Sequence, residues 1–545
     1  MAGSSLKFPN ALFSGGRGHT LPPSRFRRSD WRIACRGGLW VLVLLVGHAP
    51  WYIATAQTPS PPAGPVPAQQ WRDAALRDLE AARDLLASQT PIPYDTEHSA
   101  YRTWLERGYT SARALAEQAI DAQGHFYSIA YFMHGFGDPH IAADPLTELP
   151  EPMWPGFIAA SRDGAVVVVY RDADDPSLPP VGAQILDCDG HALSTLIEER
   201  LHPFVINPRV ALDRRRAATR LFVERGIPGA PAPKTCRFQV GGAERTDELR
   251  YRTLPLPADS FWTIFEDAFA GAHARWGIEE PARGVYWVGI PSFMSGSDAS
   301  DKLASLLAEI TRRAPEMRAG RAIVIDIRGN GGGNSAWADR IAEALFSKAI
   351  TADAARLSKQ GKTAVDWRAS RENVAHWEQT LQVIRKEFGA RSTEAREVSR
   401  VLSRLRTKVL ADPPIWRQGA THPSTGGGLT QRRPQGAGPF PADVYLLSNG
   451  SCASSCLNFA DTVLMIPGVK LIGSATGADG PYMEVRFLTL PSERVRVTIP
   501  QKVRLGSPRA AMEAYAADIP YPGPWDDQSV RQWVISLIGE SRSRQ

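Results

Sequence analysis

The sequence predicts an α/β protein with a sheet that is covered on both faces, preceded by a helical unit and a β-rich segment. Mainly apolar runs at 284–290, 322–327, 444–447 and 469–472 alternate with helical segments. Such runs are typical of strands that are buried on both faces. The length of 545 residues and the hydrophobic content of 43% exclude disordered, collagen-like and multispan membrane classes.

The formal charge of +6 is concentrated at the N-terminus. Residues 1–56 hold seven basic side chains and one acidic side chain, and the rest of the chain is formally neutral. A nucleic-acid-binding protein needs a basic surface on its folded domain. We therefore expect no nucleic acid partner.

The N-terminal 56 residues have the pattern of a signal peptide. An arginine-rich stretch, 25–36, is followed by the apolar run 39–46 and by Ala-Thr-Ala at 54–56. This order is typical of secretory leaders, and the apolar run is shorter than the ~20 residues of a spanning helix. We expect cleavage after residue 56 and export to the periplasm or the exterior. The alternative is a retained leader, which would be the only membrane attachment.

Four segments are expected after the leader. Residues 57–70 form a proline-rich linker that cannot pack. Apolar residues at three- and four-residue steps predict a helical unit over 71–154, and short β-runs predict a β domain over 155–255. Residues 256–545 are expected to hold the α/β core, with a charged, helix-rich insertion at about 350–440.

Four cysteines remain once the leader, with Cys35, is removed: Cys188, Cys236, Cys452 and Cys456. An even number in an exported chain permits two disulfides. The spacing does not fix the pairing, although Cys188 with Cys236 and Cys452 with Cys456 are the economical choices. A zinc site is not expected, because no second ligand pair stands at finger-like spacing.

A glycine-rich turn follows the run at 322–327. Residues 326–333 are Asp-Ile-Arg-Gly-Asn-Gly-Gly-Gly, and a helix is expected from about Ser335. Amides at a helix start can hold a phosphate or the oxyanion of an acyl-transfer intermediate. Nucleotide-binding motifs would need a lysine after the glycines or a glycine in place of Asn334. A turn with only a structural role is the alternative.

A second strand and turn lead into a helix at 446–461. Ser451, Ser454 and Ser455 stand at this junction, where a hydroxyl is exposed to the positive end of the helix dipole and to backbone amides. Each is a candidate nucleophile on spacing alone. Serines also cap helices, which is the alternative role.

A histidine lies in a short turn after the helical unit, where residues 136–140 are Phe-Gly-Asp-Pro-His. Histidine is the usual base for a serine nucleophile. By itself His140 is as well explained by a structural role, and Asp138 by shaping the turn.

The order of these features resembles serine peptidase family S41, the tail-specific peptidases that include carboxy-terminal processing proteases and the tricorn core protease. The resemblance spans roughly 138–518, and the segment 181–193 resembles part of a PDZ domain. It implies an S41-type core with a ClpP/crotonase-like α/β layer and a PDZ-like β domain. It also implies hydrolysis of peptide or unfolded protein substrates, with no metal or organic cofactor.

The resemblance places the nucleophile at Ser454. The oxyanion hole then falls on the amide of Ser455 and on that of Gly331 or Gly332. Processing proteases of the family activate the serine with a lysine, but Asp479 stands at the corresponding position. An aspartate is a far weaker base at neutral pH, so a Ser/Lys mechanism is not expected.

The tricorn-like branch implies a histidine base instead. It places His140 as general base and acid and Glu513 as the residue that orients it, although Pro139 replaces the serine of tricorn. We expect an exported serine-type endopeptidase or carboxy-terminal processing hydrolase that forms an acyl-enzyme on Ser454. The alternatives are an inactive peptidase-fold binding or scaffold protein, which Asp479 favours, and a cysteine hydrolase.

Overall fold

The computed structural model describes residues 66–162, 164–254, 258–358, 364–419, 433–434, 436–507 and 509–543. The expected leader, linker residues 57–65 and the glycine run at 426–428 lie outside the described residues. All the elements below belong to one compact unit, 39–545. None of the described helices is long and apolar enough to cross a membrane.

The N-terminal region is helical, as the periodicity predicted. Its helices are α1 (Ala68–Gln89), α2 (Ser99–Ala116) and α3 (Ala122–His134), with a short 3-10 helix, η1 (Ile92–Tyr94), between the first two. The apolar face of α1, including Leu79 and Leu86, is buried in a core that it shares with Val497 and Ile499. A segment from the far end of the chain therefore stabilises the helical unit.

The second region is a five-stranded antiparallel sheet in the order β3-β4-β5-β6-β7. Its elements are β3 (Phe157–Arg162), β4 (Ala165–Arg171), β5 (Gln184–Cys188), α4 (Leu193–Arg200), α5 (Ala211–Arg220), β6 (Thr235–Val240) and β7 (Ala243–Glu248). Two short strands, β2 (Met153–Trp154) and β8 (Arg252–Thr253), pair with each other, and α6 (Ala258–Asp267) follows. The predicted β-rich segment is confirmed, and its PDZ-like character stays a prediction.

The central sheet has six strands in the order β18-β15-β14-β11-β10-β9, and only β9 runs antiparallel to its neighbour. The strands are β9 (Gly277–Ala282), β10 (Val285–Gly289), β11 (Ala322–Asp326), β14 (Asp443–Ser448), β15 (Val469–Gly473) and β18 (Ile519–Pro520). The four predicted strands are thus confirmed as β10, β11, β14 and β15.

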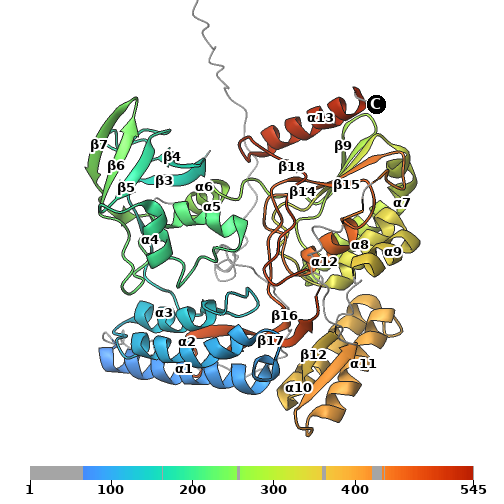
Figure 1. Ribbon diagram of the computed structural model, residues 1–545, viewed down its shortest axis with the longest axis horizontal. Helices are drawn as coiled ribbons and strands as arrows, with labels where there is room; N and C mark the ends of the chain where they lie inside the picture. The colour runs from blue at the N-terminus through green and yellow to red at the C-terminus, as the bar shows by residue number, and fades with distance from the viewer. Residues whose placement is uncertain are drawn as a thin grey trace, which may run out of the picture. The chain divides into compact units, whose positions relative to one another are not determined.

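Helices cover both faces of this sheet (Figure 1). They are α7 (Ser297–Ala319), α8 (Ser335–Phe346), α9 (Lys348–Ser358), α12 (Ser455–Val463) and α13 (Asp527–Ser543). Ile323 and Ile325 of β11 pack against the first four, whereas Val324 faces Val534 of α13. Because alternate side chains are buried on opposite faces, every residue of β11 is apolar except its last, Asp326.

A third sheet was not predicted. It runs in the order β1-β17-β12-β13, and β16 also pairs with β17. Its elements are β1 (Ala142–Pro145), β12 (Ala364–Arg368), β13 (Ile415–Gly419), β16 (Tyr482–Thr489) and β17 (Val495–Leu505), with helices α10 (Arg371–Phe388) and α11 (Thr393–Lys408) between β12 and β13. The pairing of β1 with β17 anchors the turn that holds His140, which directly precedes β1.

Candidate active site

Two strand-turn-helix junctions lie side by side at one edge of the central sheet. β11 and β14 pair in parallel, with Asp326 opposite Leu447, so the turns into α8 and α12 leave the sheet at the same edge. Gly332 in the first turn has a φ of 106°, and a Cβ added there would lie 2.7 Å from the carbonyl oxygen of Ala453. Only glycine allows the two backbones to approach this closely.

Ser454 occupies a strained position at the start of α12. Its φ is 53° and its ψ is −124°, a conformation that non-glycine residues rarely adopt, and its side chain makes no capping hydrogen bond. The Oγ lies 3.3 Å from Nε2 of His140 instead. Of the three serines at this junction, Ser454 is the one that contacts His140.

His140 is held by the aspartate two residues before it. The Oδ1 of Asp138 accepts the backbone N–H of His140 at 2.9 Å and lies 3.2 Å from Nδ1 of the ring. The Oδ2 of Asp138 accepts from the amide of Tyr482 at 3.3 Å and from the hydroxyl of Tyr101 at 3.4 Å. The carboxylate therefore shapes the turn and also fixes the orientation of the ring.

The environment of His140 favours its protonated form. The residue is only 4% exposed, and burial alone would lower its pKa. The hydrogen bond and the negative charge of Asp138, together with the charge of Asp479, raise the pKa above its ordinary value. An imidazolium formed here would be stabilised.

The predicted role of Glu513 is not supported. Its Oε2 accepts the amide of Ala510 at 2.7 Å, and Asp138 is the carboxylate beside Nδ1 of His140. The sequence of the turn predicts only a shaping role for Asp138, although an Asp-x-His spacing lets one carboxylate reach both the amide and the ring of the histidine.

The three predicted oxyanion donors differ in their hydrogen bonds. The amide of Gly332 donates to Oδ1 of Asn330 at 2.9 Å, and Asn330 is fully buried. The amides of Gly331 and Ser455 have no acceptor among the described residues. Gly331 is therefore better suited than Gly332 to pair with Ser455 as a donor.

Asp479, at the position of the family lysine, contacts the candidate nucleophile. Its Oδ2 accepts the backbone N–H of Ser454 at 3.1 Å, and its Oδ1 accepts from Nη1 of Arg509 at 2.8 Å. The Nε of Arg509 donates to Asp461 at 3.0 Å. Burial would raise the pKa of Asp479, but the positive charges of Arg509 and His140 lower it below its usual range. The carboxylate is ionised and supports the turn.

Asp326 and Arg328 form a structural pair beneath the glycine-rich turn. Both are fully buried, with Nη2 of Arg328 donating to Oδ2 of Asp326 at 2.8 Å and to Asp527 of α13 at 2.7 Å. The indole of Trp287 also donates to Asp326 at 3.0 Å. The pair therefore joins the end of β11 to the helix on the other face of the sheet.

The four predicted cysteines form two disulfides. Cys188 and Cys236 join β5 to β6, where they are opposite each other in register. Cys452 and Cys456 bridge the turn on either side of Ser454, and both are fully buried. A cysteine nucleophile is excluded by this pairing, because a thiolate is required for attack.

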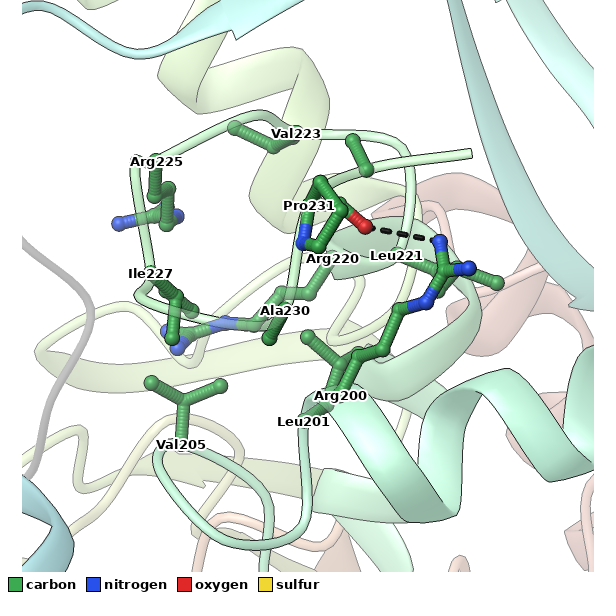
Figure 2. A pocket seen from close by; sticks show the side chains of 11 residues that line it. Arg200, Leu201, Val205, Arg220, Leu221, Val223, Arg225, Ile227, Ala230 and Pro231 are labelled. Carbon is green, nitrogen blue, oxygen red and sulfur yellow. Dashed lines mark hydrogen bonds between the residues drawn. The ribbon is translucent and has the colours of Figure 1, made fainter. Parts of the chain in front are cut away.

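Arginines line two of the hollows in the described part of the chain. One is next to Asp479 and is lined by Arg504 and Arg509. The other lies in the second region, where Arg200, Arg220 and Arg225 line it together with apolar side chains (Figure 2). There, Nη1 of Arg200 donates to the carbonyl of Pro231 at 2.8 Å. No group of three metal-ligating side chains is present among the described residues.

The fold and this arrangement define a class. A serine hydrolase needs a serine, an imidazole that contacts the serine hydroxyl and a carboxylate that contacts the imidazole. This α/β protein has all three, with the serine at a strained helix start. Residues 285–507 match the family model described as Peptidase family S41. This segment of the chain therefore resembles peptidases of that family.

Solved structures with a similar fold include two of CPAF. Mature CPAF is 16% identical and aligns over 83% of this chain and 93% of that chain, with a TM-score of 0.52. CPAF complexed with lactacystin is 15% identical over 86% of this chain and 100% of that chain, with a TM-score of 0.53. The tricorn protease is 13% identical over 86% of this chain and 37% of that chain, with a TM-score of 0.32. None of the curated proteins compared with the chain matches it.

Proposed function

We propose that this protein is an exported serine-type peptidase that cleaves peptide bonds through an acyl-enzyme on Ser454. The observation that carries the proposal is the 3.3 Å contact between Oγ of Ser454 and Nε2 of His140, two residues that are 314 positions apart in the chain. A distance of this kind between a hydroxyl and an imidazole is what general-base activation requires.

The reaction begins with proton transfer from Ser454 to His140. Neutral His140 donates its Nδ1–H to Asp138 and accepts the hydroxyl proton at Nε2, while Oγ attacks the carbonyl carbon of the scissile bond. The new imidazolium is stabilised by Asp138. It then returns the proton to the leaving amine, and a water molecule activated in the same way releases the acyl group.

The negative oxygen of the tetrahedral intermediate needs donors. The amides of Ser455 and Gly331 supply them, since neither has an acceptor among the described residues. Each such donor contributes about 3 kcal/mol to lowering the barrier. Asp479 takes no proton in this scheme, because its hydrogen bonds to Ser454 and Arg509 keep it ionised and hold the turn.

The substrate is proposed to be a peptide or an unfolded protein segment. Such a segment can add as a strand to an exposed sheet edge or dock in the PDZ-like region, where main-chain hydrogen bonds supply affinity. Cleavage near a carboxyl terminus and location in the periplasm or outside the cell are parts of the same proposal. The scheme uses neither a metal nor an organic cofactor.

Covalent labelling with a fluorophosphonate probe tests the proposal. The purified protein is expected to be labelled, and labelling is expected to be lost in Ser454→Ala and His140→Ala. Ser451→Ala is the matched control, because Ser451 lies in the same turn and makes no contact with His140 among the described residues. A folded wild-type protein that is not labelled would support an inactive, peptide-binding protein instead.

A further inference from the structure

A small pocket lies close to the proposed catalytic residues. One wall is Asp479, whose Oδ2 accepts the amide of Ser454. The next residue in that wall, Gly480, packs so closely against Asp138 that an added Cβ would lie 1.7 Å from its Oδ2. Two residues of the pocket lining therefore contact the amide of the nucleophile and the carboxylate of the base.

Arg504 of β17 supplies hydrogen-bond donors to this pocket. Its Nη2 donates to Oδ1 of Asn458 at 3.1 Å and lies 3.3 Å from Sδ of Met483, and both partners are uncharged. No carboxylate of the described residues lies within ion-pair distance of Arg504, and its Nε and Nη1 have no protein acceptor there. Burial and the positive charge of Arg509 lower the pKa of Arg504, against the negative charges of Asp461 and Asp479, which raise it.

The carboxylates that line the pocket are already engaged. Asp479 is bonded to Arg509, and both oxygens of Glu97 accept the amide of Gly506, at 3.0 and 2.9 Å. Glu97 is also exposed to solvent. A guanidinium presents its donors in a planar fork that fits a carboxylate.

We propose that Arg504 binds a carboxylate of the substrate in this pocket and so sets a preference for an acidic group near the scissile bond. This group is either an aspartate or glutamate side chain or the carboxyl terminus of the peptide. The inference rests on the proposed peptidase function and names the substrate feature that the same site recognises.

Cleavage of peptide pools by the full-length protein tests this preference. Hexapeptide pools carry Glu or Gln at one fixed position, and a further pair ends in a free carboxylate or an amide; products are identified by mass spectrometry. We expect at least one acidic pool to have a kcat/KM roughly tenfold above its neutral match, the size of a lost charge-assisted hydrogen bond. The pair of pools whose kcat/KM values differ shows whether a side-chain carboxylate or the carboxyl terminus is bound. Equal rates in all wild-type pairs would overturn the proposal without any variant.

Variants assign the preference to Arg504. Arg504→Gln is expected to abolish the acidic preference mainly through KM, with Ser454 still labelled by fluorophosphonate, and Arg504→Lys is expected to restore part of it. Arg496→Gln, on the same strand but paired with Asp144, is the matched control and is expected to keep the preference. An acidic preference that persists in Arg504→Gln would overturn the assignment.

Binding separates this inference from the proposed function. The same pools, labelled with fluorescein, are added to Ser454→Ala, which cannot turn over, and anisotropy gives the ratio of dissociation constants for acidic and neutral pools. A ratio of about ten that disappears in Ser454→Ala/Arg504→Gln supports the pocket even if the wild type is not labelled. A ratio of one in Ser454→Ala, with wild-type labelling intact, overturns the pocket alone.

Discussion

The turn from β11 into α8 and the turn from β14 into α12 have the same local design but different helix starts. The first places Asn334 at the N-cap with a φ of −88°, and its side chain accepts the amide of Ala336 at 2.9 Å. The second places Ser454 there with a φ of 53° and no side-chain cap. The first helix start has an unstrained backbone and a side-chain cap. The second has a strained backbone, and its serine hydroxyl contacts His140 instead of capping the helix.

The support beneath the two turns differs in the same way. Arg328 and Asp326 secure the first turn without contacting Ser454 or His140, while Arg509 and Asp479 secure the second through the amide of Ser454 itself. A buried ion pair at one turn stabilises the fold, and at the other it also places a reactive atom. Substitutions at equivalent positions should therefore separate stability from activity.

The largest expected difference is between the two N-cap residues. Ser454→Ala should lower kcat by roughly 10⁶-fold, as loss of the nucleophile does in serine proteases, with little change in thermal stability. Asn334→Ala should cost about 1 kcal/mol of unfolding free energy and leave kcat within a few-fold. Peptide hydrolysis and thermal melting measure both effects. Residual activity in Ser454→Ala near the wild-type level would refute the assignment of the nucleophile.

Asp138→Asn tests the carboxylate on His140. Loss of the negative charge should lower kcat by about 10⁴-fold, because the imidazolium is no longer stabilised and the tautomer is no longer fixed. His140 must be neutral to act as a base, so activity rises as pH increases through its raised pKa. The acidic limb of the pH-rate profile should therefore move to lower pH in the variant. Glu513→Gln serves as the control and should leave that limb in place.

Asp479→Asn and Asp326→Asn compare the two ion pairs. Asp479→Asn keeps an acceptor for the amide of Ser454 but leaves Arg509 with one carboxylate, and we expect a kcat about 10²-fold lower, the typical cost of a small misplacement in an active site. Asp326→Asn removes a fully buried charge from Arg328 and should destabilise the fold by about 3 kcal/mol. If both variants lost kcat equally when compared at matched stability, the two ion pairs would not differ in their role in catalysis.

The smallest effects are expected at glycines with positive φ. In Gly332→Ala the added methyl would meet the backbone of Ala453 and the side chain of Ser454, so kcat should fall roughly tenfold and stability by about 1–3 kcal/mol. Gly190→Ala has a φ of 75° but open space around it, and should show only the cost of strain, about 1 kcal/mol. Chemical denaturation and peptide hydrolysis distinguish the two.

The sequence was sufficient for the central sheet and insufficient for the third sheet, for a physical reason. Residues 322–325 of β11 are all apolar because the strand is buried on both faces, and such a run is visible without any structure. Two strands of the third sheet, Val495–Leu505 and Ala364–Arg368, carry charged residues among apolar ones, and some of their side chains are only partly buried. Their sequences therefore show no continuous apolar run. The strand that anchors the His140 turn was missed for this reason.

The sequence likewise predicted some residues of the candidate site and missed others. Ser454 and His140 came from the local turns and the resemblance, and the structure brings them together. The bonds of Arg509 to Asp479 and Asp461 join residues 30 and 48 positions apart, which no local pattern encodes. The choice of Glu513 over Asp138 relied on the family's spacing, while the nearer carboxylate satisfied the geometry.

The 314 positions between His140 and Ser454 have a consequence during synthesis. The strand that anchors the histidine turn, Val495–Leu505, leaves the ribosome after both residues. A nascent chain therefore carries each half of the site before the two halves can meet. The candidate site can therefore assemble only after the chain has been synthesised as far as Leu505.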